Sequence, residues 1–253
     1  MSGEPAAGLT YATLSGGRVV GRLDGLSAVR GIAHLFSTRD SGTLAADDPA
    51  GRPNREALGR ALGAERVVTG RQVHGTTVLD LDTDPPDGLD ADALMTARRR
   101  VALLGLSADC PILLLADPVR GAVGMAHAGW RGTAGDIAGI LVRAMAEAYG
   151  CRPGDLRAGG GPSAGPCCYA VGDEVVEAFV GVLGERAGGC VVRRDGQMYA
   201  DLWRANALLL RRAGLAVGHI EVAGACSICD NRYFSYRREG VRAGRHGGMI
   251  ARL

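Results

Sequence analysis

The sequence predicts a single α/β (α+β) domain with a mixed central sheet and flanking helices. Strand-like apolar runs alternate with helix-like amphipathic segments, and no stretch between them is longer than a loop. The 253 residues are enough to bury a full core, and 47% of them are hydrophobic. The 40 Gly residues are scattered without a G-X-Y period, which excludes a collagen-like or low-complexity chain. We therefore expect one globular domain over residues 1–253.

The first half of the chain predicts a hairpin, a loop, a short helix and three strands. Residues 1–30 mix short apolar pieces with Gly, as an N-terminal hairpin extension would. Residues 41–54 are rich in Gly, Asp and Pro and predict a loop, and REALGRALG at 55–63 predicts a short helix. Three apolar runs of strand length, separated by turn-like residues, predict central strands at 101–106, 112–116 and 122–126.

The second half predicts three helices and three further strands. Thr133 followed by Asp136 resembles a capping arrangement, and apolar residues then recur at helical spacing until Gly150. Further helices are expected at 173–186 and 201–214. Strands are expected at 156–160, 219–225 and 246–252.

The charged residues exclude several function classes. A net charge of +2 and a pI near 8.2 argue against nucleic acid as a partner. All 29 basic residues are Arg, and the absence of Lys excludes a Schiff-base lysine, a pyridoxal phosphate attachment and the Walker lysine. A phosphate would therefore be held by Arg, backbone N–H groups or a metal.

The chain shows no secretory pattern at its start and no apolar run of about 18 residues. We expect a cytoplasmic protein without a membrane partner. The seven Cys residues are then expected to be thiols, because a reducing compartment disfavours disulfides and an odd number cannot pair completely.

Three segments each place a potential metal ligand beside turn residues: His74 in GRQVHGTTV, Cys110 in SADCPILLLADP and His127 in AHAGWRG. Two imidazoles and one thiolate are typical of a catalytic zinc site with an open fourth position. The same residues fit a cysteine hydrolase, in which Cys110 is the nucleophile, His127 or His74 is the base and Asp109 or another carboxylate orients the imidazole. Cys110 as an inert buried thiol is the third interpretation.

The other cysteines carry a weaker signal. CSIC at 226–229 is a CxxC segment, but it lacks a second pair along the sequence and a thioredoxin-like context. This argues against a zinc or redox site there. We expect the adjacent Cys167 and Cys168, and the lone Cys151 and Cys190, to be structural or incidental.

Arginines beside turns are the candidates for an anion clamp. Arg39, Arg131, Arg237 and Arg245 all lie next to residues that permit close backbone approach. For any one of them, a surface salt bridge is the simpler interpretation. The glycine-rich GGGPSAG at 159–165 lacks GK[ST] and does not match a nucleotide-binding fingerprint, although its backbone N–H groups could contact a ligand.

In combination these segments resemble a known family over residues 30–253. The segments are QVHG at 72–75, ADCPILLLADP at 108–118, AHAGWRGT at 126–133, GPSAGPCCYAVGDEV at 161–175, DLWRAN at 201–206, FSYRR at 234–238 and GR at 244–245. They resemble the multicopper polyphenol oxidase (laccase-domain) family, which includes purine nucleoside phosphorylase/adenosine deaminase enzymes and the peptidoglycan editing factor.

The resemblance implies a laccase-domain (cytotoxic-necrotizing-factor-like) fold and a zinc ion bound by His74, Cys110 and His127. It also implies phosphorolysis of adenosine, inosine, guanosine and methylthioadenosine, and deamination of adenosine. A multicopper oxidase site fits poorly, because the chain has five His residues and no His-x-His pair. These three ligands would nevertheless accept copper by intrinsic affinity.

For this activity, Asp92 and Asp109 are candidates for the general acid/base because they lie close to the ligand motifs in the sequence. Arg39, Arg131 and Arg245 are candidates for binding phosphate. The loop DSGTLAADDPAG after Arg39 departs from the family pattern, so substrate contacts there are expected to differ.

Two other functions stay open at this point. One is a Cys–His amide hydrolase that acts in peptidoglycan precursor editing, and the other is a non-catalytic accessory protein. The sequence does not determine the oligomeric state.

Overall fold

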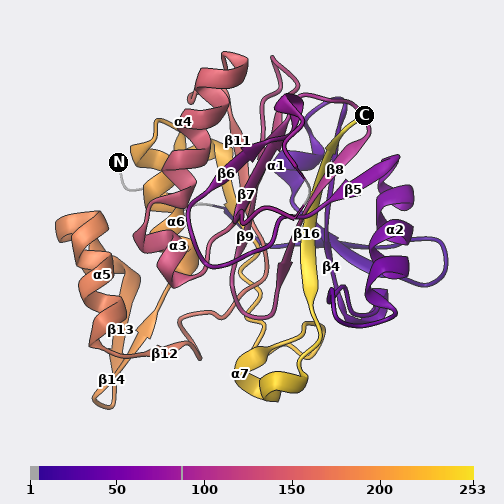
Figure 1. The fold of residues 1–253 in the computed structure, drawn as a ribbon. Helices are drawn as coiled ribbons and strands as arrows, with labels where there is room; N and C mark the ends of the chain where they lie inside the picture. The colour runs from indigo at the N-terminus through magenta and orange to yellow at the C-terminus, as the bar shows by residue number, and fades with distance from the viewer. Residues whose placement is uncertain (1–5, 87) are drawn as a thin grey trace.

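Two mixed β-sheets packed face to face form the body of the molecule (Figure 1). The computed structural model describes residues 6–86 and 88–253. The seven-stranded sheet has the order β1 (Ala6–Ala7), β15 (Ile220–Val222), β11 (Arg157–Gly160), β9 (Ile112–Ala116), β10 (Val123–His127), β7 (Ala93–Thr96) and β6 (Val78–Asp80). The six-stranded sheet has the order β2 (Thr10–Thr13), β3 (Val19–Arg22), β4 (Ile32–Ser37), β16 (His246–Arg252), β8 (Val101–Ser107) and β5 (Arg66–Val68).

Helices cover the outer face of each sheet, on opposite sides of the molecule (Figure 1). The seven-stranded sheet packs against α4 (Ile137–Tyr149) and α6 (Leu202–Arg212), with α3 (Trp130–Ala134) beside them. The six-stranded sheet packs against α2 (Gly51–Leu62). The remaining helices are α1 (Asp24–Ser27), α5 (Asp173–Leu183) and α7 (Tyr236–Glu239).

A small third sheet lies below α5, with the order β12 (Ala170–Val171), β14 (Gln197–Ala200) and β13 (Val191–Arg194). Short 3₁₀ helices occur at Arg39–Ser41, Leu81–Thr83, Gly184–Cys190, Val217–His219 and Gly240–Arg242. No helix in residues 6–86 or 88–253 is long and apolar enough to cross a membrane.

The central core lies between the two large sheets. Phe36 and Leu103 from one sheet and Ile112 and Met125 from the other are buried together there. Glycine allows the sheets to approach closely, because a Cβ added at Gly105 would lie only 2.7 Å from the Met125 sulfur and 2.9 Å from Ile112. This contact fixes β8 against β9 and β10, the strands that lead to the site described below.

The structure confirms the predicted α/β class. The strands predicted at 101–106, 112–116 and 122–126 correspond to β8, β9 and β10. The three predicted long helices are α4, α5 and α6. Of the expected capping pair, Asp136 caps α4 by accepting a hydrogen bond from the Gly139 N–H at 3.2 Å, whereas Thr133 lies within α3. The expected N-terminal hairpin is β2–β3, and it pairs with β4 as part of the six-stranded sheet. Residues 1–5 of that segment lie outside the described residues.

Three details of the prediction were wrong. The expected central strands do not form one sheet, because β8 pairs with β16 and β5 in the six-stranded sheet, whereas β9 and β10 pair with each other in the seven-stranded sheet. The loop expected over 41–54 ends earlier, since α2 begins at Gly51. Pro53 fits its first turn, where the N–H that proline lacks would have no helical partner. The hairpin β13–β14 was missed, although Asp195-Gly196 is a strong hairpin turn signal.

Candidate metal centre and active-site cavity

Strand register places two of the three expected metal ligands at the same end of the seven-stranded sheet. β9 and β10 are antiparallel, and His127, the last residue of β10, pairs with Ile112 at the start of β9. Cys110 lies two residues before Ile112, so it stands beside His127. The loop between β5 and β6 brings in His74, whose backbone adopts a positive φ of 61°. The potential ligand atoms of all three residues lie within 4.8 Å of one another.

The turn after His127 passes unusually close to these ligands. A Cβ added at Gly129 would lie 2.8 Å from the Cys110 sulfur and 3.2 Å from the His74 ring. Only glycine allows the backbone to pass at this distance without moving a ligand. The His74 and His127 rings meet edge to face, with their centroids 4.8 Å apart.

The Asp92 carboxylate accepts hydrogen bonds from both histidine residues. It is fully buried, and the donors are His127 Nδ1 at 2.8 Å and the backbone N–H of His74 at 3.0 Å. It also accepts the N–H groups of Val73 and Gly75 at 3.1 and 2.7 Å. Because Nδ1 of His127 is engaged by Asp92, Nε2 is the nitrogen left for a ligand or proton.

The electrostatics of the three residues favour a cation. Burial alone would raise the pKa of Cys110, but His127 and His74 lower it to about 6. Burial would lower the pKa of His127, but Cys110 and Asp92 raise it to about 9. A thiolate and a buried carboxylate give this cluster two negative charges around two imidazoles, which matches a divalent metal ion in charge and in donor type.

Asp109 connects this cluster to the segment that carries α7. Its backbone has a positive φ of 101°, and its buried carboxylate accepts hydrogen bonds from the Ser227 hydroxyl at 2.6 Å and the Arg237 N–H at 2.7 Å. Asp109 also lines the cavity beside Cys110. The 226–239 segment is thereby fixed against the metal-ligand loop.

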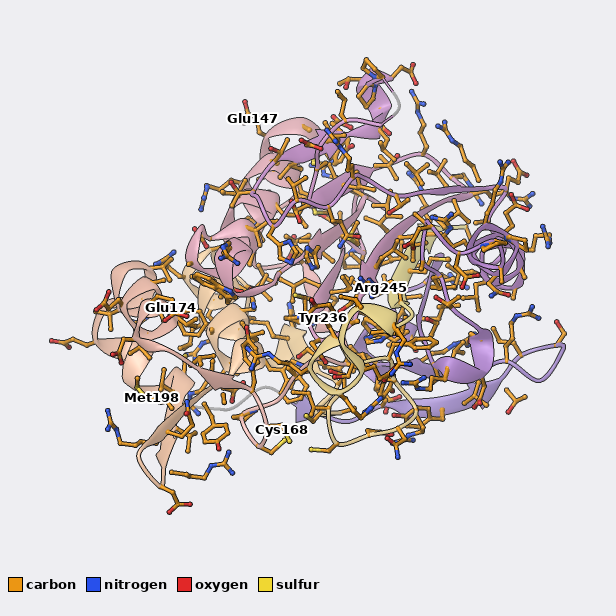
Figure 2. All side chains as sticks on the ribbon, turned by 60° about the horizontal axis from the view of Figure 1, so that its bottom comes forward. Glu147, Cys168, Glu174, Met198, Tyr236 and Arg245 are labelled. Carbon is orange, nitrogen blue, oxygen red and sulfur yellow. The ribbon has the colours of Figure 1, made fainter. Side chains whose placement is uncertain are left out.

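A cavity of ≈ 680 Å³ opens over the three ligands. This volume lies within the range of small-molecule sites. Aromatic rings and guanidinium groups line its walls: Trp130, Tyr169 and Tyr236 with Arg71, Arg131, Arg237 and Arg245. Figure 2 shows Tyr236 and Arg245 near one another on this face of the molecule. The Arg131 guanidinium lies 4.2 Å from the Trp130 ring centroid, and that of Arg237 lies 5.0 Å from the Tyr169 ring centroid.

The arginines expected to bind phosphate lie in different places. Arg131 and Arg245 line the cavity, whereas Arg39 is not among the described residues that line it. The Arg39 guanidinium pairs with Glu239, donates to the Tyr233 carbonyl at 3.1 Å and lies 4.4 Å from the Phe234 ring centroid. These contacts favour a structural role for Arg39.

Sequence reasoning did not identify the aromatic walls. Trp130, Tyr169 and Tyr236 each lie next to a motif residue, in GWRG, CCYA and FSYRR, so adjacency to the motifs was the available signal. Gln72 was also missed. Its side chain exchanges two hydrogen bonds with the Leu106 backbone, at 2.7 and 2.8 Å, and so anchors the His74 loop to β8.

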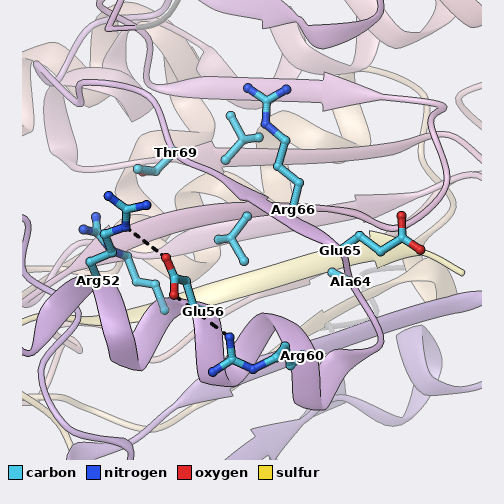
Figure 3. Close-up of a pocket in the computed structure, with 10 residues that line it drawn as sticks. Arg52, Glu56, Arg60, Ala64, Glu65, Arg66 and Thr69 are labelled. Atoms are coloured by element: carbon cyan, nitrogen blue, oxygen red, sulfur yellow. Dashed lines mark hydrogen bonds and ion pairs between the residues drawn. The ribbon is translucent and has the colours of Figure 1, made fainter.

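A second hollow of ≈ 500 Å³ lies between α2 and β5 (Figure 3). It is rich in arginine, but Glu56 is paired with Arg52 at 2.9 Å and with Arg60 at 4.0 Å, and these side chains are well exposed. Its described lining contains neither His nor Cys. The combination of metal-ligating and cationic groups therefore favours the first cavity as the functional site.

Comparison with known proteins shows the family of the chain. The family model described as multi-copper polyphenol oxidoreductase laccase matches residues 21–253. A purine nucleoside phosphorylase of Deinococcus radiodurans is 38% identical over 87% of this chain and 88% of its own length. An adenosine deaminase, RL5, from an unknown prokaryotic organism is 33% identical over 89% of this chain and 88% of its own.

A solved structure has the same fold. The crystal structure of YlmD from Geobacillus stearothermophilus superposes with a TM-score of 0.86 at 29% identity, covering 96% of this chain and 98% of that one. Relatives named as nucleoside enzymes thus share this chain nearly end to end. The chain belongs to the multi-copper polyphenol oxidoreductase laccase family.

Proposed function

We propose that the protein is a zinc-dependent purine nucleoside enzyme that catalyses phosphorolysis of purine nucleosides and deamination of adenosine. One observation carries the proposal: three potential metal ligands converge in a nucleoside-sized cavity whose walls carry arginine and aromatic side chains. The names of the relatives, purine nucleoside phosphorylase and adenosine deaminase, support the same chemistry.

His74, Cys110 and His127 would hold the zinc ion, and three protein ligands leave a position open to the cavity. A zinc ion there supplies Lewis-acid chemistry to groups that develop negative charge. Asp92 acts as a positioning residue, because all of its hydrogen bonds hold the His127 ring and the His74 loop.

The cavity walls would bind the two substrates. Arg131, Arg237 and Arg245 are the cationic groups for phosphate, since guanidinium groups match phosphate oxygens in charge and geometry. The rings of Trp130 and Tyr169 give a purine base apolar surface for stacking. This arrangement would hold phosphate and nucleoside together and lower the entropic cost of their reaction.

Asp109 is our proposed general acid/base. Unlike Asp92, it lines the cavity, and each of its oxygens accepts one hydrogen bond from the residues that the structure describes. A carboxylate with accessible lone pairs next to the substrate can move a proton to or from the purine. Asp109→Asn is then expected to lower kcat about 100-fold or more while the metal content is unchanged.

Product analysis by mass spectrometry tests the proposed function. Purified protein is incubated with adenosine, with and without phosphate, beside Cys110→Ala and a matched Cys151→Ala control outside the cavity. Adenine and ribose 1-phosphate formed only with phosphate, or inosine formed in either buffer, support the proposal if Cys110→Ala loses them and Cys151→Ala keeps them. Absence of any product from wild-type protein loaded with zinc would overturn it.

A second candidate function has one geometric observation in its favour. Cys110, His127 and Asp92 lie in the order of a nucleophile, base and orienting carboxylate, which is the arrangement of cysteine hydrolases. The substrate would be an amide of a peptidoglycan precursor. Hydrolysis that survives complete metal removal but is lost in Cys110→Ala would favour this function over the zinc enzyme, because a thiolate bound to zinc is not a free nucleophile.

A further inference from the structure

Four cysteines that are far apart in the sequence meet at a second place in the fold. Cys167 and Cys168 come from the loop between β11 and β12, and Cys226 and Cys229 come from the loop after β15. The Cys229 sulfur lies 2.9 Å from that of Cys168 and 3.5 Å from that of Cys167. All four sulfur atoms lie within 4.8 Å of one another. The CxxC segment that lacks a second pair along the sequence therefore acquires one from the fold.

We propose that this four-cysteine cluster is a structural zinc site, separate from the site in the cavity. Zinc bound by four thiolates at about 2.3 Å in a tetrahedron places its sulfurs about 3.8 Å apart. The separations here, from 2.9 Å up to at most 4.8 Å, bracket that value. Four protein ligands would leave no open position, so the site is structural. It goes beyond the proposed nucleoside chemistry and does not depend on it.

The two loops are already held in register by their backbones. The Ser227 N–H donates to the Ser163 carbonyl at 2.9 Å, and the Asp230 N–H donates to that of Cys226 at 2.9 Å. The Arg238 guanidinium donates to the carbonyls of Ser227 and Ile228 at 2.8 and 2.9 Å. The cluster is thus built on a fixed scaffold, which lowers the entropic cost of gathering four ligands.

Backbone groups are also directed at the sulfur that is buried. The Gly165 N–H donates to the Cys226 sulfur at 3.3 Å. Burial would raise the pKa of Cys226, but the N–H groups of Gly165, Cys229 and Ile228 offset this and lower it. N–H donors around a cysteine sulfur stabilise the thiolate, which is the form that binds a metal.

Two of the other thiols, those of Cys167 and Cys229, have pKa values raised by their surroundings. Burial and the nearby Cys226 raise the pKa of Cys167 to about 11, and hydrogen bonding to Cys168 raises that of Cys229. Several thiolates within 4.8 Å would repel strongly, and a divalent cation between them removes that repulsion. A single disulfide would use two of the four sulfurs and leave the convergence of the other two unexplained.

The cluster is linked to the cavity through its neighbours in the chain. Tyr169, which follows Cys168 in the chain, lines the cavity wall. Ser227, which lies between Cys226 and Cys229, donates its hydroxyl to Asp109, the neighbour of Cys110. A zinc ion here would therefore stabilise the cavity through Tyr169 and through the Ser227–Asp109 hydrogen bond. Figure 2 shows Cys168 on the same face of the molecule as Tyr236 and Arg245.

Metal analysis of the full chain tests this proposal. Each protein is loaded with zinc sulfate, passed through a desalting column and measured for zinc per chain. We expect about two equivalents in wild type and in the Cys151→Ala control, and one less in Cys229→Ala, whose side chain is exposed and tolerant of change. His74→Ala should lose only the zinc ion in the cavity. If wild type binds one equivalent and that equivalent is lost in Cys229→Ala, the four-cysteine site is supported and the cavity site is wrong.

The absorption spectrum of the cobalt(II)-loaded protein gives a readout that does not depend on the number of metal ions per chain. Cobalt bound to four thiolates shows intense sulfur-to-metal charge-transfer absorption, which should persist in His74→Ala and fall by at least about half in Cys229→Ala. The proposal is overturned if Cys229→Ala binds as much zinc as wild type. It is also overturned if non-reducing mass spectrometry of zinc-loaded protein finds a Cys168–Cys229 disulfide.

Discussion

Replacing Asp92 with asparagine isolates the contribution of one buried carboxylate to the cavity metal site. In the native protein Oδ1 accepts hydrogen bonds from His127 Nδ1 and the His74 N–H, and Oδ2 accepts the N–H groups of Val73 and Gly75. An asparagine amide can replace only one of the two oxygens. Whichever way it is turned, its NH₂ group therefore faces at least one backbone N–H that has lost its acceptor. When it faces His127, it can donate to Nδ1 only if that ring carries its proton on Nε2, the nitrogen that a metal needs.

The expected cost follows from that backbone N–H. A donor left without an acceptor costs about 1–3 kcal/mol, so Asp92→Asn should lower the free energy of unfolding by about that amount or more. Loss of a carboxylate behind a metal-ligating histidine typically weakens metal binding about 10–100-fold. We expect zinc affinity to fall within that range, because the His127 ring and the His74 loop lose their common anchor.

Asp117→Asn is the matched control. Asp117 is equally buried, but it lies at the other end of β9 from Cys110. Its Oδ1 alone accepts the N–H groups of Val119 and Arg120, so an amide can keep that oxygen in place. The control should therefore bind zinc with wild-type affinity.

Competition with a chromophoric chelator measures zinc affinity, and urea unfolding of the metal-free proteins measures stability. Both experiments are run on wild type and on the two variants. To exclude the four-cysteine cluster, the competition is repeated in a Cys229→Ala background. If Asp92→Asn folds and binds cavity zinc as tightly as wild type, the assigned role of the carboxylate is wrong.

Three other predictions follow from the same structure. Gly129→Ala should release the cavity metal with little loss of fold, because its Cβ would lie 2.8 Å from the Cys110 sulfur, and zinc content checks this against Gly154→Ala, where no atom lies within 4 Å. Arg245→Ala should raise the KM for phosphate about tenfold or more without changing adenosine deamination, since a charge-assisted hydrogen bond contributes about 1.5–3 kcal/mol. An unchanged phosphate KM would remove this residue from the phosphate site. Burial and a nearby arginine lower the pKa of His34 to about 4, and its Nε2 accepts a backbone N–H bond. The folded protein therefore binds fewer protons than the unfolded chain between about pH 6.5 and 4, and stability should fall by up to about 3 kcal/mol as the pH drops through that window. Urea unfolding at a series of pH values should show a shallower fall in His34→Gln, and an identical pH profile would contradict the assignment.

Local patterns determined most of the secondary structure. Apolar runs of strand length and helical periodicity depend on neighbours within a few residues, so β8, β9, β10 and α4 could be recognised directly. The Asp136 cap is likewise a contact between residues three apart. The metal-ligand candidates could be identified too, because His74, Cys110 and His127 each lie in a distinctive motif.

Long-range pairing decided what local patterns could not. The division into two sheets depends on β16, which comes from the end of the chain and pairs with β4 and β8. No property of the 101–106 run alone indicates which sheet will accept it. The same limit applied to the arginines, where Arg39 and Arg245 look equivalent in sequence but only Arg245 lines the cavity.

The two cysteine-containing sites show this division most clearly. Residue chemistry by itself determined that His74, Cys110 and His127 were metal-ligand candidates and that CxxC at 226–229 lacked a partner. Only the tertiary structure placed Cys167 and Cys168 against that CxxC, because the contact joins loops about 60 residues apart through the parallel pairing of β11 with β15. A metal site needs ligands close in space, and sequence spacing reports that distance only when all the ligands lie in one local element.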